Sequence, residues 1–402
     1  MIVQRTFLGT FLGGRRWTEP WRIRVDTRAG GTSNLTIANY MRSNSSDYPI
    51  LTDWGDGTRT VSKNIASHTY ASDGDYVISH YSLDNFNTAY LKNGSHENIV
   101  EVIDPFPRLP LMGDGFSSVF SYDSYLQTIP SNLFDNNADF ITSLSGTFLA
   151  ITGGPLRIPS GLFKSLTKLS NISGTFLRSV LDYIPDGLFE GMTTIVDADQ
   201  TFTKAKASYS GNRIFAGCTG LTSIDHCFGS AEIPVFGDDT FNGCTGITTG
   251  NTYTFSGITS TKNVGARTFA NCTNIEQGEY NFCRTTSNGP TMELESIGDY
   301  TWQNCTSLTD TVYFLKNVPK LKTLPPHTFS GCTKLTQASY LLYEDAPAFG
   351  AMDLYMDSCF HTSLGFKGVP DMTPTTQRVI HIPRRCGAVS GYPSKYTVVA
   401  DN

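Results

Sequence analysis

Cysteine and histidine are the residue types of this 402-residue chain that most often carry chemistry, and it contains nine and seven of them. The histidines are scattered, and none stands in a spacing such as H-E-x-x-H that would place two imidazoles on one metal ion. Cys359 and His361 stand two residues apart, but no second pair completes a tetrahedral zinc site. We therefore expect no metal site and no cofactor.

Carboxylates gather in one N-terminal stretch, at Asp53, Asp56, Asp73 and Asp75. Such a set could form an oxygen-rich calcium site. It lacks the regular ligand spacing of a calcium loop, and a tight hairpin turn at Asp56-Gly57 explains Asp56 without a metal. We favour a structural role for these carboxylates, and calcium binding is the alternative.

Other catalytic signatures are absent from the sequence as well. The sequence has no G-x-S-x-G nucleophile motif, no phosphate-binding loop and no dinucleotide fingerprint. We expect that the chain is not an enzyme.

The composition narrows the class of partner. Only 16% of the residues are charged, against roughly 25% in ordinary soluble domains. The net charge is -6 and no basic run is present, which argues against a nucleic-acid partner. No apolar run approaches the length of about 18 residues needed for a membrane span, so we expect no membrane insertion.

The first 20 residues are predicted to form an N-terminal arm. One arginine precedes a short, glycine-broken apolar stretch and two more follow it, which is the wrong order for a secretory signal. We expect that no signal peptide was removed. The arm either docks on the neighbouring domain or anchors the protein to a partner.

Five of the cysteines occupy one position of an internal repeat, three residues after an aromatic residue: Cys218, Cys244, Cys272, Cys305 and Cys332. Leu166 and Met192 hold this position in earlier repeats. A position that accepts Leu, Met or Cys is a buried packing position, because free cysteine behaves as a small hydrophobe. These thiols are therefore expected to pack in the core rather than form disulfides or bind metal.

The repeat is defined by aromatic anchors that recur every 26 to 33 residues: Phe134, Phe163, Phe189, Phe215, Phe241, Phe269, Trp302 and Phe329. A second aromatic column follows 13 or 14 residues after the anchors, at Phe148, Phe176, Phe202, Phe228, Phe255 and Phe282. One repeat cannot bury both aromatic residues, but stacked repeats can. Each repeat is predicted to supply a short helical turn with the anchor and a strand with the second aromatic residue.

The pattern I-G-x-x-x-F-x-x-C-T-x-L-T is clearest at Ile297 to Thr309 and at Leu324 to Thr336. It closely resembles the BspA-like (Treponema-type) leucine-rich repeat, and the resemblance spans about 120 to 345. It implies a solenoid of about eight repeats. The usual I-x-I-P-x-x-V-T strand is replaced by an S-G-T-F or Y-N-F segment and by inserts such as Lys204 to Arg213 and Thr285 to Glu295, which leaves the curvature open.

Short alternating runs between Trp21 and Asp104 predict the strands of an all-β sandwich. The segment also carries a turn motif followed by two aromatic motifs, made of Asp53, Trp54, Gly55, Asp56, Gly57, His68, Tyr70 and Tyr76. Together these residues resemble the PKD-type immunoglobulin-like domain. The resemblance implies a spacer or adhesive module rather than an enzyme, with Tyr70 and Tyr76 in the interior.

The predicted organisation has four parts: an arm at 1–20, a PKD-like sandwich at 21–104, a leucine-rich-repeat solenoid at 105–345 and a C-terminal cap at 346–402. The cap contains a β-like stretch at Arg378 to Pro383 that would pair with the last strand of the repeats. The predicted fold class is mainly β with short helices.

A candidate binding row lies next to the second aromatic column, because neighbours of an inward residue on a strand face outward. It consists of Thr147, Thr175, Thr201, Cys227, Thr254 and Asn281. Small polar side chains on a flat sheet suit hydrogen bonding to a glycan or a protein, although threonine also simply favours strands. Tyr253 and Tyr280, one residue further back, could supply stacking.

These features predict a non-enzymatic structural and recognition protein that is part of a larger assembly. The low-charge composition, rich in Thr, Ser, Gly, Tyr and Phe, is typical of assembled extracellular fibres and favours a tailed-phage virion component, a tail or particle-surface protein. Its N-terminal region would contact other virion proteins, and its solenoid would contact a host-surface protein or glycan. The alternatives are an adhesin on the bacterial cell surface and a carbohydrate-active enzyme on a repeat scaffold.

Overall fold

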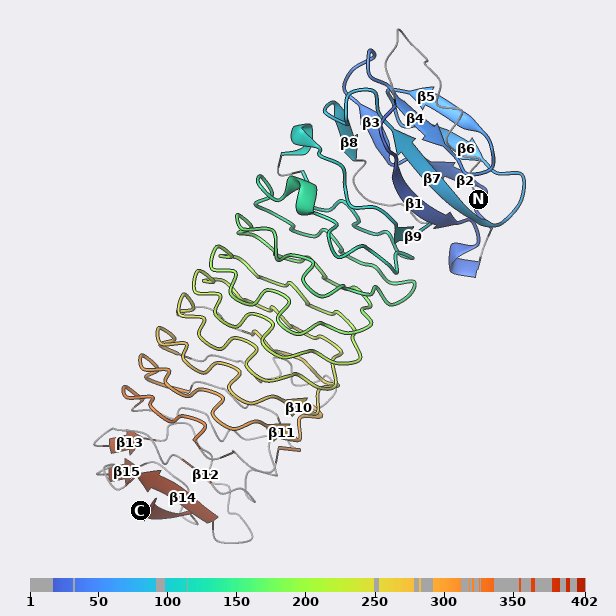
Figure 1. Ribbon diagram of the computed structural model, residues 1–402. Helices are drawn as coiled ribbons and strands as arrows, with labels where there is room; N and C mark the ends of the chain where they lie inside the picture. Colours follow the sequence, from blue (N-terminus) through green and yellow to red (C-terminus); the bar gives the residue numbers. More distant parts are fainter. Residues whose placement is uncertain are drawn as a thin grey trace. The chain divides into compact units, whose positions relative to one another are not determined.

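The computed structural model forms two compact units, Met1–Lys168 and Leu169–Asn402, which are described separately (Figure 1). It describes residues 17–335 except 32, 92–97, 114, 249–252, 278–281, 283–291, 312–317, 319, 322–324 and 326, together with 354–355, 363–365, 378–383, 388–390 and 396–401. The described part of the chain is mainly β-structure and turns. Its helices are three short 3₁₀ turns, η1 (Ala29–Gly31), η2 (Pro110–Met112) and η3 (Asp135–Asn137), and none of the helices in these residues could cross a membrane.

The first unit is built on a five-stranded antiparallel sheet. In spatial order its strands are β5 (Arg59–Ser62), β4 (Ile50–Asp53), β7 (Asp75–Tyr81), β1 (Trp21–Asp26) and β9 (Ile99–Val102). Two short antiparallel pairs accompany it: β2 (Thr36–Ala38) with β6 (Ser67–Thr69), and β3 (Met41–Ser43) with β8 (Ala89–Leu91). Strand β1 alternates as predicted, because Trp21, Ile23 and Val25 are buried.

The hairpin between β4 and β5 has the turn that the sequence predicted. Gly55 and Gly57 adopt φ angles of 85° and 90°, a region that L-residues with a side chain rarely enter. A Cβ atom on Gly55 would lie 2.6 Å from the carbonyl oxygen of Val77. Glycine is therefore required at position 55 by both backbone conformation and space.

The edge strand β9 continues into the first coil of the repeats. Glu101 forms a parallel bridge with Thr128, which forms the next one with Arg157. Tyr125 fills a narrow space beside this junction, since a Cβ atom on Gly153 would lie 2.2 Å from its ring. The first coil thus covers an edge that would otherwise expose unpaired backbone groups.

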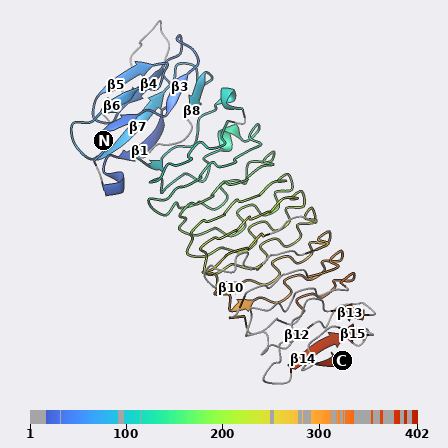
Figure 2. The same ribbon diagram turned by 180° about the vertical axis from the view of Figure 1, so that it is seen from behind.

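The second unit consists of stacked coils made of hydrogen-bonded turns, and Figure 2 shows successive coils running side by side. Where both flanking residues are described, each aromatic residue of the two columns in this unit has a left-handed residue two positions before it and another two after it, such as Gln200 (φ 55°) and Lys204 (φ 56°) about Phe202. The backbone N–H of Phe202 then donates to the carbonyl of Cys227 in the next coil, at 2.7 Å. Most of the coil is therefore neither helix nor strand, although its backbone is hydrogen-bonded from coil to coil.

The predicted positions of helix and strand within the repeat were wrong. The short strands β10 (Asn263–Val264) and β11 (Ser296–Ile297) pair in parallel at the aliphatic position five residues before the anchor. The second aromatic column lies on a turn. The first anchor, Phe134, does precede the short 3₁₀ turn η3, but the described anchors of the second unit lie on turns without a helix. Left-handed residues on both sides of these second-unit anchors prevent a regular strand or helix from forming there.

Both predicted aromatic columns form buried ladders. In the second unit the anchor rings stack at 5.2 Å (Phe189–Phe215), 5.0 Å (Phe215–Phe241), 5.3 Å (Phe241–Phe269), 6.1 Å (Phe269–Trp302) and 5.4 Å (Trp302–Phe329). The second column stacks at 5.3 Å (Phe176–Phe202), 5.1 Å (Phe202–Phe228), 5.2 Å (Phe228–Phe255) and 4.9 Å (Phe255–Phe282). In the first unit Phe134 stacks with Phe163 at 6.1 Å. Stability therefore comes largely from contacts between neighbouring coils.

The C-terminal part contains the predicted strand at β14 (Arg378–Pro383). It lies between β12 (Leu354–Tyr355) and β16 (Tyr396–Asp401) in a parallel sheet, and β13 (Ser363–Gly365) pairs with β15 (Ala388–Ser390). The sequence predicted that this strand pairs with the last strand of the repeats. Among the described strands, β14 pairs instead with β12 and β16 of the C-terminal part.

Candidate recognition surface

The predicted exposed row beside the second aromatic column is buried. Thr147, Thr175, Thr201, Cys227 and Thr254 each have 0% of their surface exposed, and Asn281 lies outside the described residues. The hydroxyl of Thr201 donates to the carbonyls of Ala198 (2.7 Å) and Ile172 (3.2 Å). These residues serve the core, so they cannot form a binding face.

The physical reason is the turn. A two-residue period holds only on a strand, whereas here a threonine and the aromatic residue after it both point inward. The same pair recurs at the anchors, where Thr240, Thr268, Thr301 and Thr328 are also buried. Threonine before both aromatic columns was a sequence signal for a shared structural role.

The five repeat cysteines are buried free thiols, as predicted. Each thiol donates to the carbonyl of the anchor in the preceding coil, for example Cys244 to Phe215 at 3.0 Å. Burial raises the pKa of Cys218 and of Cys272 to about 12. These thiols are held in the protonated, unreactive form.

The PKD-like motif residues come together at one end of the first unit. Trp54 and Tyr70 are buried, His68 stacks on Trp54 at 5.1 Å, and Tyr76 is half-buried and stacks on Tyr70 at 3.8 Å. His68 Nε2 lies 2.7 Å from Asp56 Oδ2. Tyr70 is thus interior as predicted, while Tyr76 is only partly so.

A carboxylate of this motif is held ionised by its neighbours. Burial would raise the pKa of Asp56, but hydrogen bonds from Thr58 and His68 lower it to about 2. Its hydrogen bonds with Thr58 and His68, and the hairpin turn that it closes, give Asp56 a structural role.

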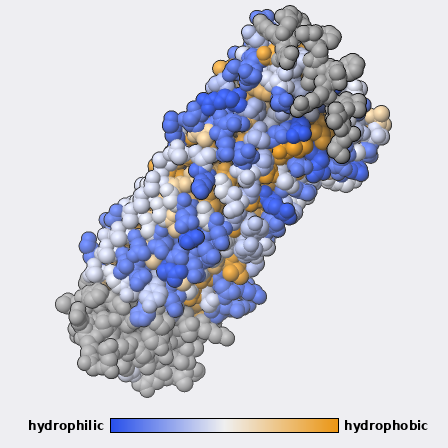
Figure 3. Space-filling view, in the orientation of Figure 1, coloured by the Kyte–Doolittle hydropathy of each residue, from blue (hydrophilic) through white to orange (hydrophobic). Residues whose placement is uncertain are grey.

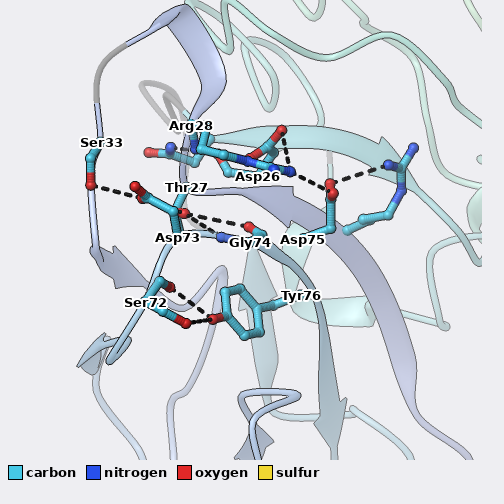
Figure 4. Close-up of polar contacts among 11 residues, drawn as sticks. Asp26, Thr27, Arg28, Ser33, Ser72, Asp73, Gly74, Asp75 and Tyr76 are labelled. Atoms are coloured by element: carbon cyan, nitrogen blue, oxygen red, sulfur yellow. Dashed lines mark hydrogen bonds and ion pairs between the residues drawn. The ribbon is translucent and has the colours of Figure 1, made fainter.

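Asp73 and Asp75 were the other carboxylates considered for a calcium site. They lie in a separate network, where β1 ends and β7 begins (Figure 4). Asp73 accepts hydrogen bonds from Thr27 (3.0 Å) and Ser33 (2.8 Å), and Asp75 pairs with Arg28 at 2.7 Å. Among the described residues, no three His, Cys, Asp or Glu side chains are placed to hold a metal ion. Cys359 and His361 lie outside the described residues.

An exposed face does exist on the second unit, at the segments that precede the anchors. Parallel bridges join Val180, Lys206 and Glu232, and a second set joins Ile184, Ser210 and Phe236. Between these two sets Ala207 is buried, and a bend at Ser208 leaves both Ser208 and Tyr209 exposed. Three adjacent coils therefore present the same three outward positions side by side.

We call this surface the tyrosine face. It is formed by Val180, Asp182, Tyr183, Lys206, Ser208, Tyr209, Glu232, Pro234 and Val235. Tyr183 and Tyr209 stack at 5.1 Å with ring planes 7° apart. Tyr209 is 45% exposed and Val235 is 41% exposed, so the column of Tyr183, Tyr209 and Val235 offers apolar surface to solvent.

The same positions continue in two further coils with polar residues. Val235 bridges to Asn263, which pairs with Ser296, and Ser296 Oγ donates to Asn263 Oδ1 at 2.7 Å. The side chains of Asn263 and Ser296 are exposed. On the view in Figure 3 hydrophobic residues gather in small groups among hydrophilic ones.

Tyr253, considered for stacking, is half-buried and stacks on His226 at 5.1 Å, whereas Tyr280 lies outside the described residues. The tyrosine face was not predicted, because residues 204 to 213 were interpreted as an insert. The alternation A-K-A at 205 to 207 was a sequence signal for an extended segment, but it does not predict the bend at Ser208 that leaves Tyr209 exposed.

Coils joined by parallel bridges, with aromatic ladders inside and an exposed side-chain face, define a repeat protein. The model of the BspA type leucine rich repeat region matches residues 127–276 and 251–342 with six copies, which together are more than half of the chain. The chain belongs to this family.

Two solved structures are similar to the chain, each at 13% sequence identity. A leucine-rich repeat protein from Bacteroides ovatus covers 90% of this chain and 89% of its own, with a TM-score of 0.27. A leucine rich cell surface protein from Faecalibacterium prausnitzii covers 77% of this chain and 92% of its own, with a TM-score of 0.20. No curated protein matches the chain. The family assignment therefore rests on the repeat match.

Proposed function

We propose that this chain is a non-enzymatic recognition and adhesion protein whose repeats present a binding face. The observation that supports the proposal is the tyrosine face, where the exposed Tyr209 stacks on the half-buried Tyr183 of the neighbouring coil. Exposed tyrosine offers a large contact area at low entropic cost, and it is enriched at interfaces.

The contacts of the cysteine, threonine and carboxylate side chains support a structural role for them. The five repeat cysteines and the buried threonines before the aromatic columns face the core, with hydrogen bonds such as Cys244 to Phe215 and Thr201 to Ala198. In the first unit Asp75 pairs with Arg28, and Asp56 is hydrogen-bonded with Thr58 and His68. We therefore place the function on the surface of the protein.

For the biological setting we propose a tailed-phage virion component that contributes to host attachment. Residues 21–104 would act as a PKD-like sandwich that joins the protein to the particle, and the repeats would face the host. The composition supports this setting, since it combines few charges with abundant threonine, serine, glycine and aromatic residues. The alternative setting is an adhesin of the bacterial cell surface.

Mass spectrometry of purified phage particles whose genome encodes the chain tests the setting. The protein is expected in intact particles, and particles lacking residues 120–345 are expected to adsorb poorly to host cells. Absence from the particles, or unchanged adsorption, would overturn the virion setting. Recovery of the protein in the envelope fraction of phage-free cells would favour the adhesin.

A further inference from the structure

The tyrosine face extends over five coils as one strip with two outward columns. One column is Tyr183, Tyr209, Val235, Asn263 and Ser296, and the neighbouring column is Asp182, Ser208, Pro234, Lys262 and Glu295. At the usual strand spacing of about 4.8 Å, five coils span roughly 20 Å. A ligand that uses the whole strip must be extended and must offer similar groups at each step.

The backbone of the strip is not available to such a ligand. Its N–H groups already donate between coils, as in Ser208 to Asp182 (3.1 Å), Glu232 to Ala205 (2.8 Å) and Lys262 to Pro234 (2.9 Å). A peptide that adds a strand to a sheet needs free backbone groups at an edge. Recognition on this strip is therefore by side chains.

The ionisable side chains of the strip and of the bridge positions beside it carry both signs. They are Asp182, Lys206, Glu232, Lys262, Glu293 and Glu295. Lys206 and Glu232 are paired at 2.9 Å, and Glu293 pairs with Lys320. Mixed, partly paired charges produce no one-signed field of the kind that concentrates polyanions or polycations. This pattern favours a ligand without net charge.

The remaining side chains offer apolar area beside hydrogen-bonding groups. The Tyr183–Tyr209 stack and Val235 supply apolar contact, and Asn263, Ser296 and the tyrosine hydroxyls supply donors and acceptors. A sugar ring has the complementary chemistry, with C–H groups on its faces and hydroxyls around its edge. An extended oligosaccharide repeats that chemistry once per ring.

We infer that the tyrosine face and its continuation at Asn263 and Ser296 bind an uncharged, extended oligosaccharide, with Tyr183 and Tyr209 contacting its apolar surface. This inference rests on the proposed recognition function and names its ligand class. The tyrosines act through contact area and hydroxyl contacts, and no bond of the sugar is broken.

Binding of the full chain to an array of uncharged, sialylated and sulfated oligosaccharides tests the ligand class. We expect binding among the uncharged oligosaccharides, and Tyr209→Ala is expected to weaken it about tenfold, the size of a moderate hot spot. Tyr209→Phe keeps the ring and is expected to weaken it less. Val196→Ala, at a residue that is 46% exposed outside the strip, is the matched control and is expected to bind normally.

A second arm separates this inference from the proposed function. The full chain is added to a panel of bacterial cells treated either with protease or with periodate, which oxidises sugar diols. Binding that survives protease and is lost after periodate supports the inference. Binding that survives periodate and is lost after protease overturns the inference and leaves the recognition function standing. Binding only to charged oligosaccharides, or unchanged binding by Tyr209→Ala, also overturns the inference, whereas no binding to any cell overturns both.

Discussion

The thiol of Cys272 donates a hydrogen bond to the carbonyl oxygen of Phe241, the anchor of the preceding coil, at 3.1 Å. The same contact joins Cys305 to Phe269 at 3.2 Å and Cys332 to Trp302 at 3.0 Å. Each of these carbonyls also accepts the backbone N–H of the residue three positions later, such as Cys244 to Phe241 at 3.1 Å. Cysteine thus fills the core of the coil and gives the carbonyl a second donor, from the next coil.

This arrangement predicts the reactivity of the thiols. Because burial raises the pKa of Cys218 and of Cys272 to about 12, almost none of either thiol is ionised at pH 8. In the native protein these cysteines are expected to react with iodoacetamide far more slowly than in denaturant. Peptide mapping of the labelled positions measures this. Rapid native labelling of Cys218 or Cys272 would contradict the packing role.

The anchor ladder predicts a large loss of stability on truncation of a ring. Phe241 is fully buried and stacks on Phe215 and Phe269. Phe241→Ala is expected to lower the free energy of unfolding of its unit by about 3–5 kcal/mol, because it creates a cavity between two coils. Urea unfolding measures the change. Val196→Ala, at an exposed residue, is the control and is expected to change it by less than about 0.5 kcal/mol.

The sequence predicted the ladders well because a column of similar side chains at a constant interval can be buried only by stacking. It did not predict the backbone between them. Left-handed conformations at Arg213, Asp239 and Arg267, two residues before the anchors, are found at residue types that do not require them. They are imposed by stacking between coils, so no local propensity reveals them.

The prediction of an exposed binding row beside the second aromatic column was wrong for a related reason. A two-residue period was assumed at Thr201 and Phe202, where a turn places both inward. After the buried Ala207, a bend at Ser208 places both Ser208 and Tyr209 outward. Spacing fixed which residues are equivalent in successive coils. Which side each residue faces depends on the local backbone.

The buried threonines give a direct test of the corrected assignment. Thr201→Val keeps the shape of the side chain but removes a hydroxyl that donates to Ala198 and Ile172. The expected cost is about 1 kcal/mol in the free energy of unfolding, because two carbonyls lose a buried donor. Thr201→Ser retains the donor and loses a buried methyl group. The exposed Thr193 supplies the control, and a Thr201→Val protein as stable as Thr193→Val would return Thr201 to the surface.

The last prediction concerns acid sensitivity of the first unit. His80 on β7 is fully buried, its ring lies 5.5 Å from that of Trp21, and its Nε2 accepts the backbone N–H of Tyr40 at 3.3 Å. Burial lowers the pKa of His80 to about 3, and the Trp21 backbone only partly opposes this shift. The folded unit therefore holds a neutral imidazole whose protonation would break the contact with Tyr40.

The sign of the pH dependence follows from proton binding. An unfolded histidine takes up a proton near pH 6.5, whereas folded His80 does so only near pH 3, so the unfolded state binds more protons between these values. The contribution of His80 is complete above pH 6.5 and falls below it, by up to about 1.4 kcal/mol per pH unit. Urea unfolding at pH 7 and pH 5 should show a smaller loss for His80→Leu than for the unmodified protein, with His68→Gln as the control. Equal losses in both proteins, or an NMR titration of His80 near pH 6.5, would contradict the prediction.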